Sequence, residues 1–152
     1  MSDIPAIINT GIISNEWDQA WLETVSFKDL QPKPVLIITS PYRDSRSEEP
    51  QLQKMLEACK LTTDQYNIIQ INENQLIRIA TLSNKLSIKT VLLLGILPNQ
   101  LGISAQFILN TPNRFADSIF IPALSIWEME QQPELKKQLW NNALKPVFIE
   151  NK

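Results

Sequence analysis

The side chains of this chain that could do chemistry gather in one short segment, IITSPYRDS, at residues 37–45. This segment carries hydroxyls at Thr39 and Ser40, a phenol at Tyr42 and a carboxylate at Asp44. An acid placed just after a buried strand is suited to act as a general base. Asp44 is therefore either such a base or a solvated charge in a polar loop, and the polar residues around it favour the solvated charge.

Two absences exclude most other catalytic chemistry. The chain has no histidine, which removes serine–histidine and cysteine–histidine nucleophile pairs and the commonest metal ligand. Its single cysteine, Cys59, can form neither an internal disulfide nor a cysteine cluster for a metal. The spacing of LQKMLEACKL predicts that Cys59 is a buried thiol on the inner face of a helix. With only three glycines and no glycine-rich phosphate loop, the sequence predicts neither a metal nor a cofactor.

The composition is that of an ordinary globular domain. Hydrophobic residues make up 43% and charged residues 20% of the 152 residues, and the formal net charge is −2. A domain that depends on phosphate contacts is usually basic, so we expect at most a weak contact with single-stranded DNA. Arg43, Arg46 and Lys54 either form a small basic patch for such a contact or belong to a solvated loop. The acidic residues beside them favour the solvated loop.

The sequence shows neither a membrane-spanning nor a targeting segment. No apolar run reaches the roughly 18 residues that a transmembrane helix needs. The first residues, MSDIPAIINTG, lack the basic segment and the long apolar core of a signal peptide. We therefore expect a cytoplasmic protein with no membrane contact.

Hydrophobic periodicity predicts strands that alternate with helices. Short apolar runs predict buried strands, and apolar residues at helical spacing predict helices. The predicted strands are residues 35–39, 66–71, 91–94 and 118–121, and the predicted helices are residues 15–27, 50–61, 73–86 and 133–144. Pro50 and Asn72 are the expected starts of the second and third helices. The alternation predicts an α/β fold with a four-stranded, mainly parallel sheet covered by helices on both faces.

One domain is expected over residues 1–152, with an N-terminal helical segment at residues 1–30. In parallel sheets, sites form in the loops beyond the carboxyl ends of the strands. The corresponding loops here are residues 40–49, 72–74, 95–102 and 122–127. We therefore expect any functional site to be made by these four loops together.

Several segments, taken in order, resemble the uracil-DNA glycosylase superfamily. The segment IITSPYRDS is similar to the loop after the first strand of that family, with Pro41 and Tyr42 matching the proline and tyrosine of one branch. KTVLLLGILPNQLG resembles its third strand and glycine turn, and IPALSIWEMEQQPELKKQLW resembles its closing motif and last helix. In this motif Ile121 stands where the family has histidine, followed by Pro122. The resemblance covers roughly residues 34–145 and implies a three-layer α/β/α sandwich.

The catalytic residues of that family do not carry over. Glycosidic cleavage needs a group that places water and a donor that stabilises the departing base. Thr39 and Ser40 stand at the acid position, and Ile121 offers no donor, so we expect a degenerate pocket and no catalysis. Two alternatives stay open: a divergent glycosylase that uses Asp44, and a DNA-binding protein that grips an extruded base with arginines clustered around the pocket.

The chain also resembles the psi-subunit family of bacterial DNA polymerase III clamp loaders, which has this fold without the chemistry. The similar segments are NEWDQAWL, LTTDQYNIIQINENQLIRIA and IPALSIWEMEQQPELKKQLW. This resemblance implies a non-catalytic replication subunit that bridges the clamp loader to single-strand-binding protein. Trp17 and Trp21 would then be partner-binding anchors, because tryptophan supplies a large contact area at interfaces. The alternative is that both tryptophans pack a helix onto the sheet of their own domain.

Overall fold

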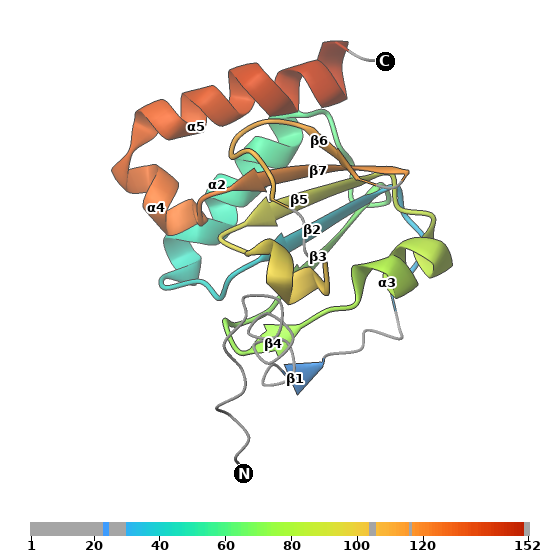
Figure 1. Cartoon of the computed structure of the whole chain (residues 1–152). Coiled ribbons are helices and arrows are strands. Elements are labelled where there is room, and N and C mark those ends of the chain that lie inside the picture. The colour runs from blue at the N-terminus through green and yellow to red at the C-terminus, as the bar shows by residue number, and fades with distance from the viewer. Residues whose placement is uncertain (1–22, 25–29, 104–105, 116, 151–152) are drawn as a thin grey trace.

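The protein is a mixed α/β domain built on a five-stranded, mostly parallel sheet (Figure 1). The structure is a computed structural model, which describes residues 23–24, 30–103, 106–115 and 117–150. The sheet has the strand order β3-β2-β5-β7-β6. Its members are β2 (Val35–Thr39), β3 (Tyr66–Gln70), β5 (Thr90–Leu94), β6 (Asn113–Phe115) and β7 (Ser118–Ala123). Strands β2, β3, β5 and β7 run parallel, and β6 pairs antiparallel to β7.

The two central strands, β2 and β5, are buried at every position. Their continuous apolar runs, VLIIT and TVLLL, suit strands that are covered on both faces. Because successive side chains point to opposite faces of a sheet, Ile37 packs into one hydrophobic core, whereas Leu36 and Ile38 pack into the other. The predicted strands at these positions are confirmed.

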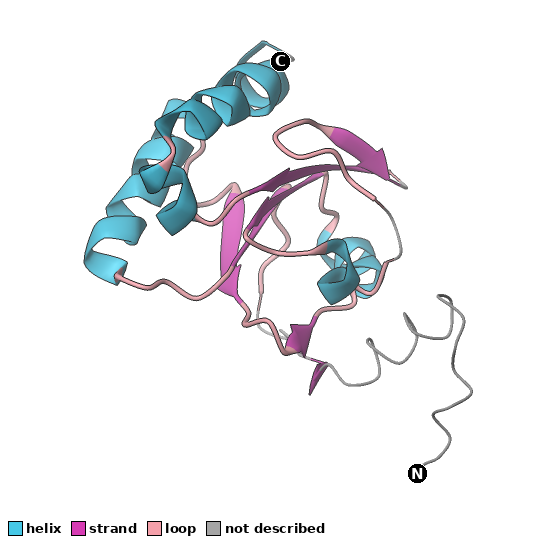
Figure 2. Cartoon of the chain, turned by 60° about the vertical axis from the view of Figure 1, so that its left-hand side comes forward, coloured by secondary structure: helices cyan, strands magenta, loops and turns pink. Residues whose placement is uncertain are grey.

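The two cores lie on opposite faces of the sheet and are closed by different helices (Figures 1 and 2). One face carries α2 (Ser45–Ala58), α4 (Ile126–Gln131), α5 (Pro133–Leu139) and the π-helix η3 (Trp140–Glu150). The other face carries α3 (Ile79–Leu86) and the 3-10 helix η2 (Pro98–Leu101). Among the described helices, none is long and apolar enough to cross a bilayer.

The prediction of four strands was wrong by one strand in the main sheet. The edge strand β6 has only three residues, of which Arg114 and Phe115 are exposed, so it lacks the apolar run that indicates a strand. A separate two-stranded sheet pairs β1 (Glu23–Thr24) with β4 (Gln75–Leu76). These two-residue strands are too short to produce a periodic pattern in the sequence.

The predicted start of the second helix was also wrong. Helix α2 begins at Ser45, five residues before Pro50, because Asp44 caps it. The Asp44 side chain accepts a hydrogen bond from the Arg46 amide at 3.1 Å, which satisfies one of the free donors of the first turn. Pro50 therefore lies inside the helix.

The third helix begins at Ile79 rather than after Asn72. The Asn72 side chain accepts a hydrogen bond from the Asn74 amide at 2.9 Å and forms a local turn instead of a helix cap. The backbone then enters β4, where pairing with β1 replaces the expected helical turn.

At the C-terminus, the predicted helix over residues 133–144 is longer and divided. It begins at Pro133 as α5 and continues as η3 to Glu150. The preceding α4 was not predicted, although Ser125 and Glu128 form the capping box that marks its start.

The predicted N-terminal segment at residues 1–30, with Trp17 and Trp21, lies largely outside the described residues. The helix predicted over residues 15–27 is wrong at Glu23 and Thr24, which form β1. Pairing with the β4 backbone, a contact between distant parts of the chain, sets the conformation of these two residues.

Candidate functional site: a pocket at the strand ends

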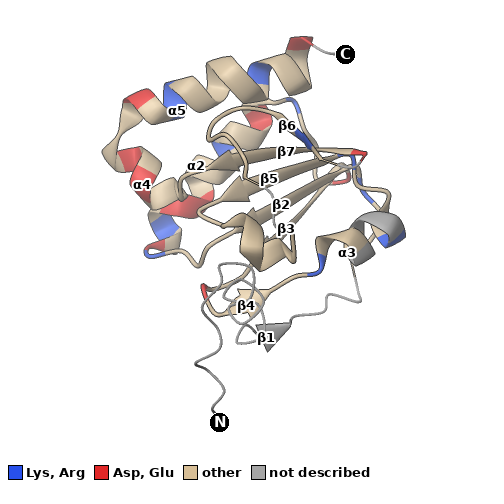
Figure 3. Cartoon of the chain, in the orientation of Figure 1, with Lys and Arg blue, Asp and Glu red and all other residues tan. Residues whose placement is uncertain are grey.

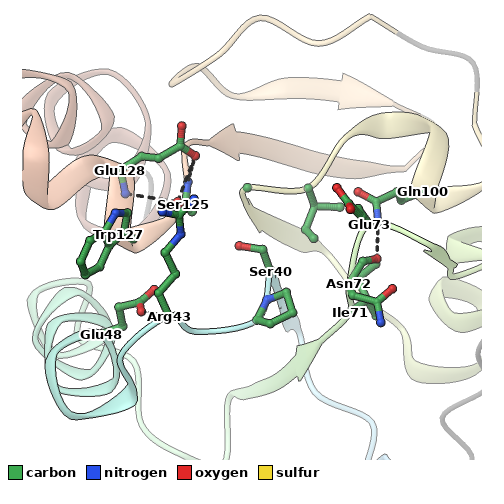
Figure 4. Close-up of a pocket in the computed structure, with 13 residues that line it drawn as sticks. Ser40, Arg43, Glu48, Ile71, Asn72, Glu73, Gln100, Ser125, Trp127 and Glu128 are labelled. Atoms are coloured by element: carbon green, nitrogen blue, oxygen red, sulfur yellow. Dashed lines mark hydrogen bonds between the residues drawn. The ribbon is translucent and has the colours of Figure 1, made fainter.

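A pocket of about 470 Å³ lies at the carboxyl ends of the parallel strands (Figure 4). Its lining comes from the four loops that follow β2, β3, β5 and β7, together with Ile71 and Glu128 at their margins. The four predicted loops therefore contribute to one pocket, and its use as a functional site stays a prediction. Of the predicted pocket residues, Ser40 and Pro41 line this hollow.

The centre of the pocket is formed where the β2 and β5 loops approach closely. The Ser40 amide donates to the Leu94 carbonyl at 2.9 Å, which extends the sheet pairing beyond β2. Gly95 follows with φ of 75°, a left-handed conformation that favours glycine. A Cβ atom at Gly95 would lie 2.8 Å from Ser40 Oγ and 2.9 Å from Ser125 Cβ. Gly95 therefore allows three strand-end loops to converge.

One wall of the pocket is organised by the buried carboxylate of Glu48. Only 2% of this residue is exposed, and its Oε2 atom accepts hydrogen bonds from the amides of Arg43 at 2.6 Å and Asp44 at 2.7 Å. These contacts fold the loop back onto the first turn of α2. The acidic residues beside Arg43 and Arg46 predict a solvated loop, and for Glu48 this prediction is wrong. Glu48 stands one residue beyond the capping-box position, so that motif does not reveal it.

Arg43 and Trp127 form the outer part of the same wall. The Arg43 guanidinium lies 5.6 Å from the centre of the Trp127 ring, within the range of a cation–π contact. Beside them, Ser125 Oγ donates to Glu128 Oε1 at 3.0 Å and accepts from the Glu128 amide at 3.2 Å. Figure 4 shows this group on the opposite side of Ser40 from Asn72 and Gln100.

The opposite wall is held by Gln100, which is 5% exposed. Its Nε2 atom donates to the carbonyls of Asn72 at 2.8 Å and Gln75 at 3.2 Å, and its Oε1 atom accepts from the Leu97 amide at 3.3 Å. This side chain ties η2 to the turn after β3. The sequence analysis did not single it out, because its partners are distant along the chain.

The other predicted pocket residues lie elsewhere. Thr39 is 1% exposed, and its hydroxyl donates to the Ser40 carbonyl at 3.0 Å. Tyr42 packs against the core beneath α2, and burial, followed by the charges of Glu49 and Glu48, raises the pKa of its phenol. Asp44 is occupied as the cap of α2. Ile121 is fully buried in the core, and Pro122 lines a neighbouring hollow.

The charge of the pocket is predominantly acidic. It carries three carboxylates, from Glu48, Glu73 and Glu128, against the single guanidinium of Arg43. Figure 3 shows acidic positions on α2 and α4 near the strand ends. Within the described residues, no group of three or more potential ligands is arranged to hold a metal ion. Because carboxylates outnumber the guanidinium in its lining, the pocket is better suited to a cationic or neutral ligand than to a phosphate.

Comparison with protein-family models, with curated proteins and with solved structures finds no match to this chain.

Proposed function

We propose that this protein is a non-catalytic replication accessory subunit, similar to the psi subunit of DNA polymerase III, which bridges the clamp loader to single-strand-binding protein. Its fold would be the three-layer α/β/α sandwich of the uracil-DNA glycosylase superfamily. The proposal combines the ordered sequence resemblance with the chemistry of the strand-end pocket, and contacts with the clamp loader would be made through Trp17 and Trp21.

The observation that carries the proposal is the position of Ile121. It stands where the resemblance expects a histidine, yet 0% of it is exposed and it packs in the core with Leu92 and Ile37. An aliphatic side chain in a closed core can neither donate a hydrogen bond to a departing base nor reach the pocket. Its position therefore supports a structural use of this strand.

The charge of the pocket argues against the binding of DNA with an extruded base. An extruded base would bring its flanking phosphates to the rim, where Glu73 and Glu128 are exposed. The DNA-binding alternative requires clustered arginines, but Arg43 is the only arginine or lysine among the lining residues. The alternative with Asp44 as a base is disfavoured because this carboxylate caps α2.

A pull-down tests the proposal directly. Purified protein is mixed with the clamp-loader core and single-strand-binding protein of its host, as wild type and as a Trp17→Ala, Trp21→Ala double variant. We expect the wild type to be retained and the double variant to be lost. A Glu16→Ala, Gln19→Ala variant of the same segment serves as the matched control and should be retained. Absence of wild-type retention would overturn the bridging function.

A further inference from the structure

A second hollow, of about 260 Å³, lies beside the strand-end pocket. Its lining is largely apolar and comes from the segment after β5, the segment before β6 and the end of β7. The two hollows share Gly95, Ile96 and Glu128. The two hollows are therefore neighbours, and we refer to them together as the groove, with an acidic half and an apolar half.

The apolar half exposes large side chains at its edges. Leu97 is 64% exposed and Leu109 is 45% exposed, and both line the hollow. Phe107 also lines the hollow. Its ring stacks on the buried Phe120 with ring centres 5.2 Å apart, so packing against the core fixes the position of Phe107. Exposed apolar side chains around a supported hollow are typical of a protein-binding surface.

The acidic half offers carboxylates that lack a cationic partner. No ion pair joins any described residue to Glu48, Glu73 or Glu128. Glu128 Oε1 accepts a hydrogen bond from Ser125, and Glu48 Oε2 accepts hydrogen bonds from two backbone amides. The other oxygen of each carboxylate makes no hydrogen bond within the described part of the chain. Glu48 is nevertheless almost completely buried and borders the pocket. Its second oxygen is not one of the buried atoms without a partner, so this oxygen keeps contact with the open pocket, where a cationic group is a favourable partner.

We propose that this groove binds an extended segment of a partner protein that carries an apolar side chain and, within about three residues, a lysine or arginine. The apolar side chain would enter between Leu97 and Leu109, and the cationic group would reach Glu128 and Glu48. This proposal rests on the proposed non-catalytic function, since an enzyme would need the pocket for its substrate. It adds the surface and the chemistry of a partner.

Charge complementarity separates this occupant from two others. Residues 1–27 of the chain contain neither lysine nor arginine, so these residues lack the side chain that the acidic half requires. Single-stranded DNA would place phosphates against Glu73 and Glu128, which repel them. A basic and apolar protein segment satisfies both halves of the groove.

The test is a nitrogen–proton NMR titration of the full chain with synthetic heptapeptides. The probe is Gly-Ser-Leu-Gly-Arg-Ser-Gly, and its matched controls replace leucine by serine or arginine by glutamate. We expect saturable shifts of the Trp127 indole signal and of the Leu97 and Leu109 amides, with binding at least about fivefold weaker for either control peptide. Trp127→Phe identifies the indole signal.

Variants of exposed residues locate the binding surface without disturbing the core. Leu109→Ser and Glu128→Gln should each weaken binding of the leucine–arginine peptide about fivefold. Ile108→Ser is the matched control, because Ile108 is 68% exposed but does not line the groove, and it should bind as the wild type does.

Three results would overturn the groove proposal: no shift with the probe peptide, equal binding of the glutamate peptide, or the same residues shifting instead with an oligothymidylate. Shifts that depend on protein concentration without peptide would assign the groove to a second copy and would also overturn it. Peptide binding that persists while the clamp-loader pull-down fails would remove the bridging function alone. Retention by the clamp loader without peptide binding would remove the groove alone.

Discussion

The strand-end pocket has an inner part around Glu48 and Gly95, here called the floor, and a rim that carries Glu73 and Glu128, and the two parts use glutamate for different ends. On the floor, Glu48 is 2% exposed and accepts two backbone amide hydrogen bonds, so its carboxylate organises the loop after β2. On the rim, Glu73 and Glu128 are exposed and form no ion pair with a described residue. Glu128 also helps to cap α4 through Ser125, so among these three carboxylates it is the exposed Glu73 that has no hydrogen bond within the described residues.

The largest effect is expected directly beneath the floor, at Ile121. Ile121→His would introduce the histidine that the proposed glycosylase resemblance expects, but it would bury a polar ring in a closed core and remove packing there. We expect the free energy of unfolding to fall by about 4 kcal/mol, measured by urea denaturation. Ile121→Val should cost only about 1 kcal/mol. Uracil release from single-stranded DNA by the histidine variant would contradict the conclusion that position 121 cannot reach the pocket.

On the floor itself, Gly95→Ala should destabilise the protein by about 3 kcal/mol. The new Cβ atom would meet Ser40 Oγ at 2.8 Å and would occupy a left-handed backbone conformation. Gly102→Ala is a matched control, because Gly102 has φ of 71° but the atoms nearest to its new Cβ would lie 3.9 Å away. This control should cost only about 1 kcal/mol by urea denaturation. Equal losses for the two variants would show that crowding at Gly95 is unimportant.

Glu48→Ala tests the contrast between buried and exposed carboxylates. It removes the acceptor of the Arg43 and Asp44 amides and should lower the free energy of unfolding by about 2 kcal/mol. Glu73→Ala on the rim should change it by no more than about 0.5 kcal/mol. Thermal and urea denaturation of both variants provide the measurement, and similar losses would remove the distinction between floor and rim.

A smaller effect is expected at the other end of α2, where Cys59 is buried. Burial raises the pKa of the Cys59 thiol to about 12. The unfolded chain therefore loses this proton at lower pH than the folded chain, so stability should fall as pH rises from about 9 toward 12. We expect a loss of about 1 kcal/mol at pH 10, measured by urea denaturation. A Cys59→Ala variant should show a flatter pH dependence, and an unchanged slope would exclude this thiol as the cause.

Most of the sheet could be predicted from the sequence, and most of the pocket's internal contacts could not. The apolar runs of β2 and β5 indicate buried strands, and parallel strands bring their following loops to one edge. By contrast, the predicted starts at Pro50 and Asn72 were wrong because the Asp44 and Asn72 side chains accept hydrogen bonds from nearby backbone amides and so set the local backbone. Capping depends on the conformation of a few residues, which periodicity does not reveal.

The sequence by itself determined the strand bodies, the meeting of four loops and the absence of histidine chemistry, because these depend on residue type and on periodic patterns. Only the tertiary structure decided which side chains face the pocket. It placed Ile121 in the core, made Glu48 a buried acceptor and brought Gln100 to the turn after β3. These positions depend on contacts between segments far apart in the chain, and such contacts arise only when the sheet and its helices pack together.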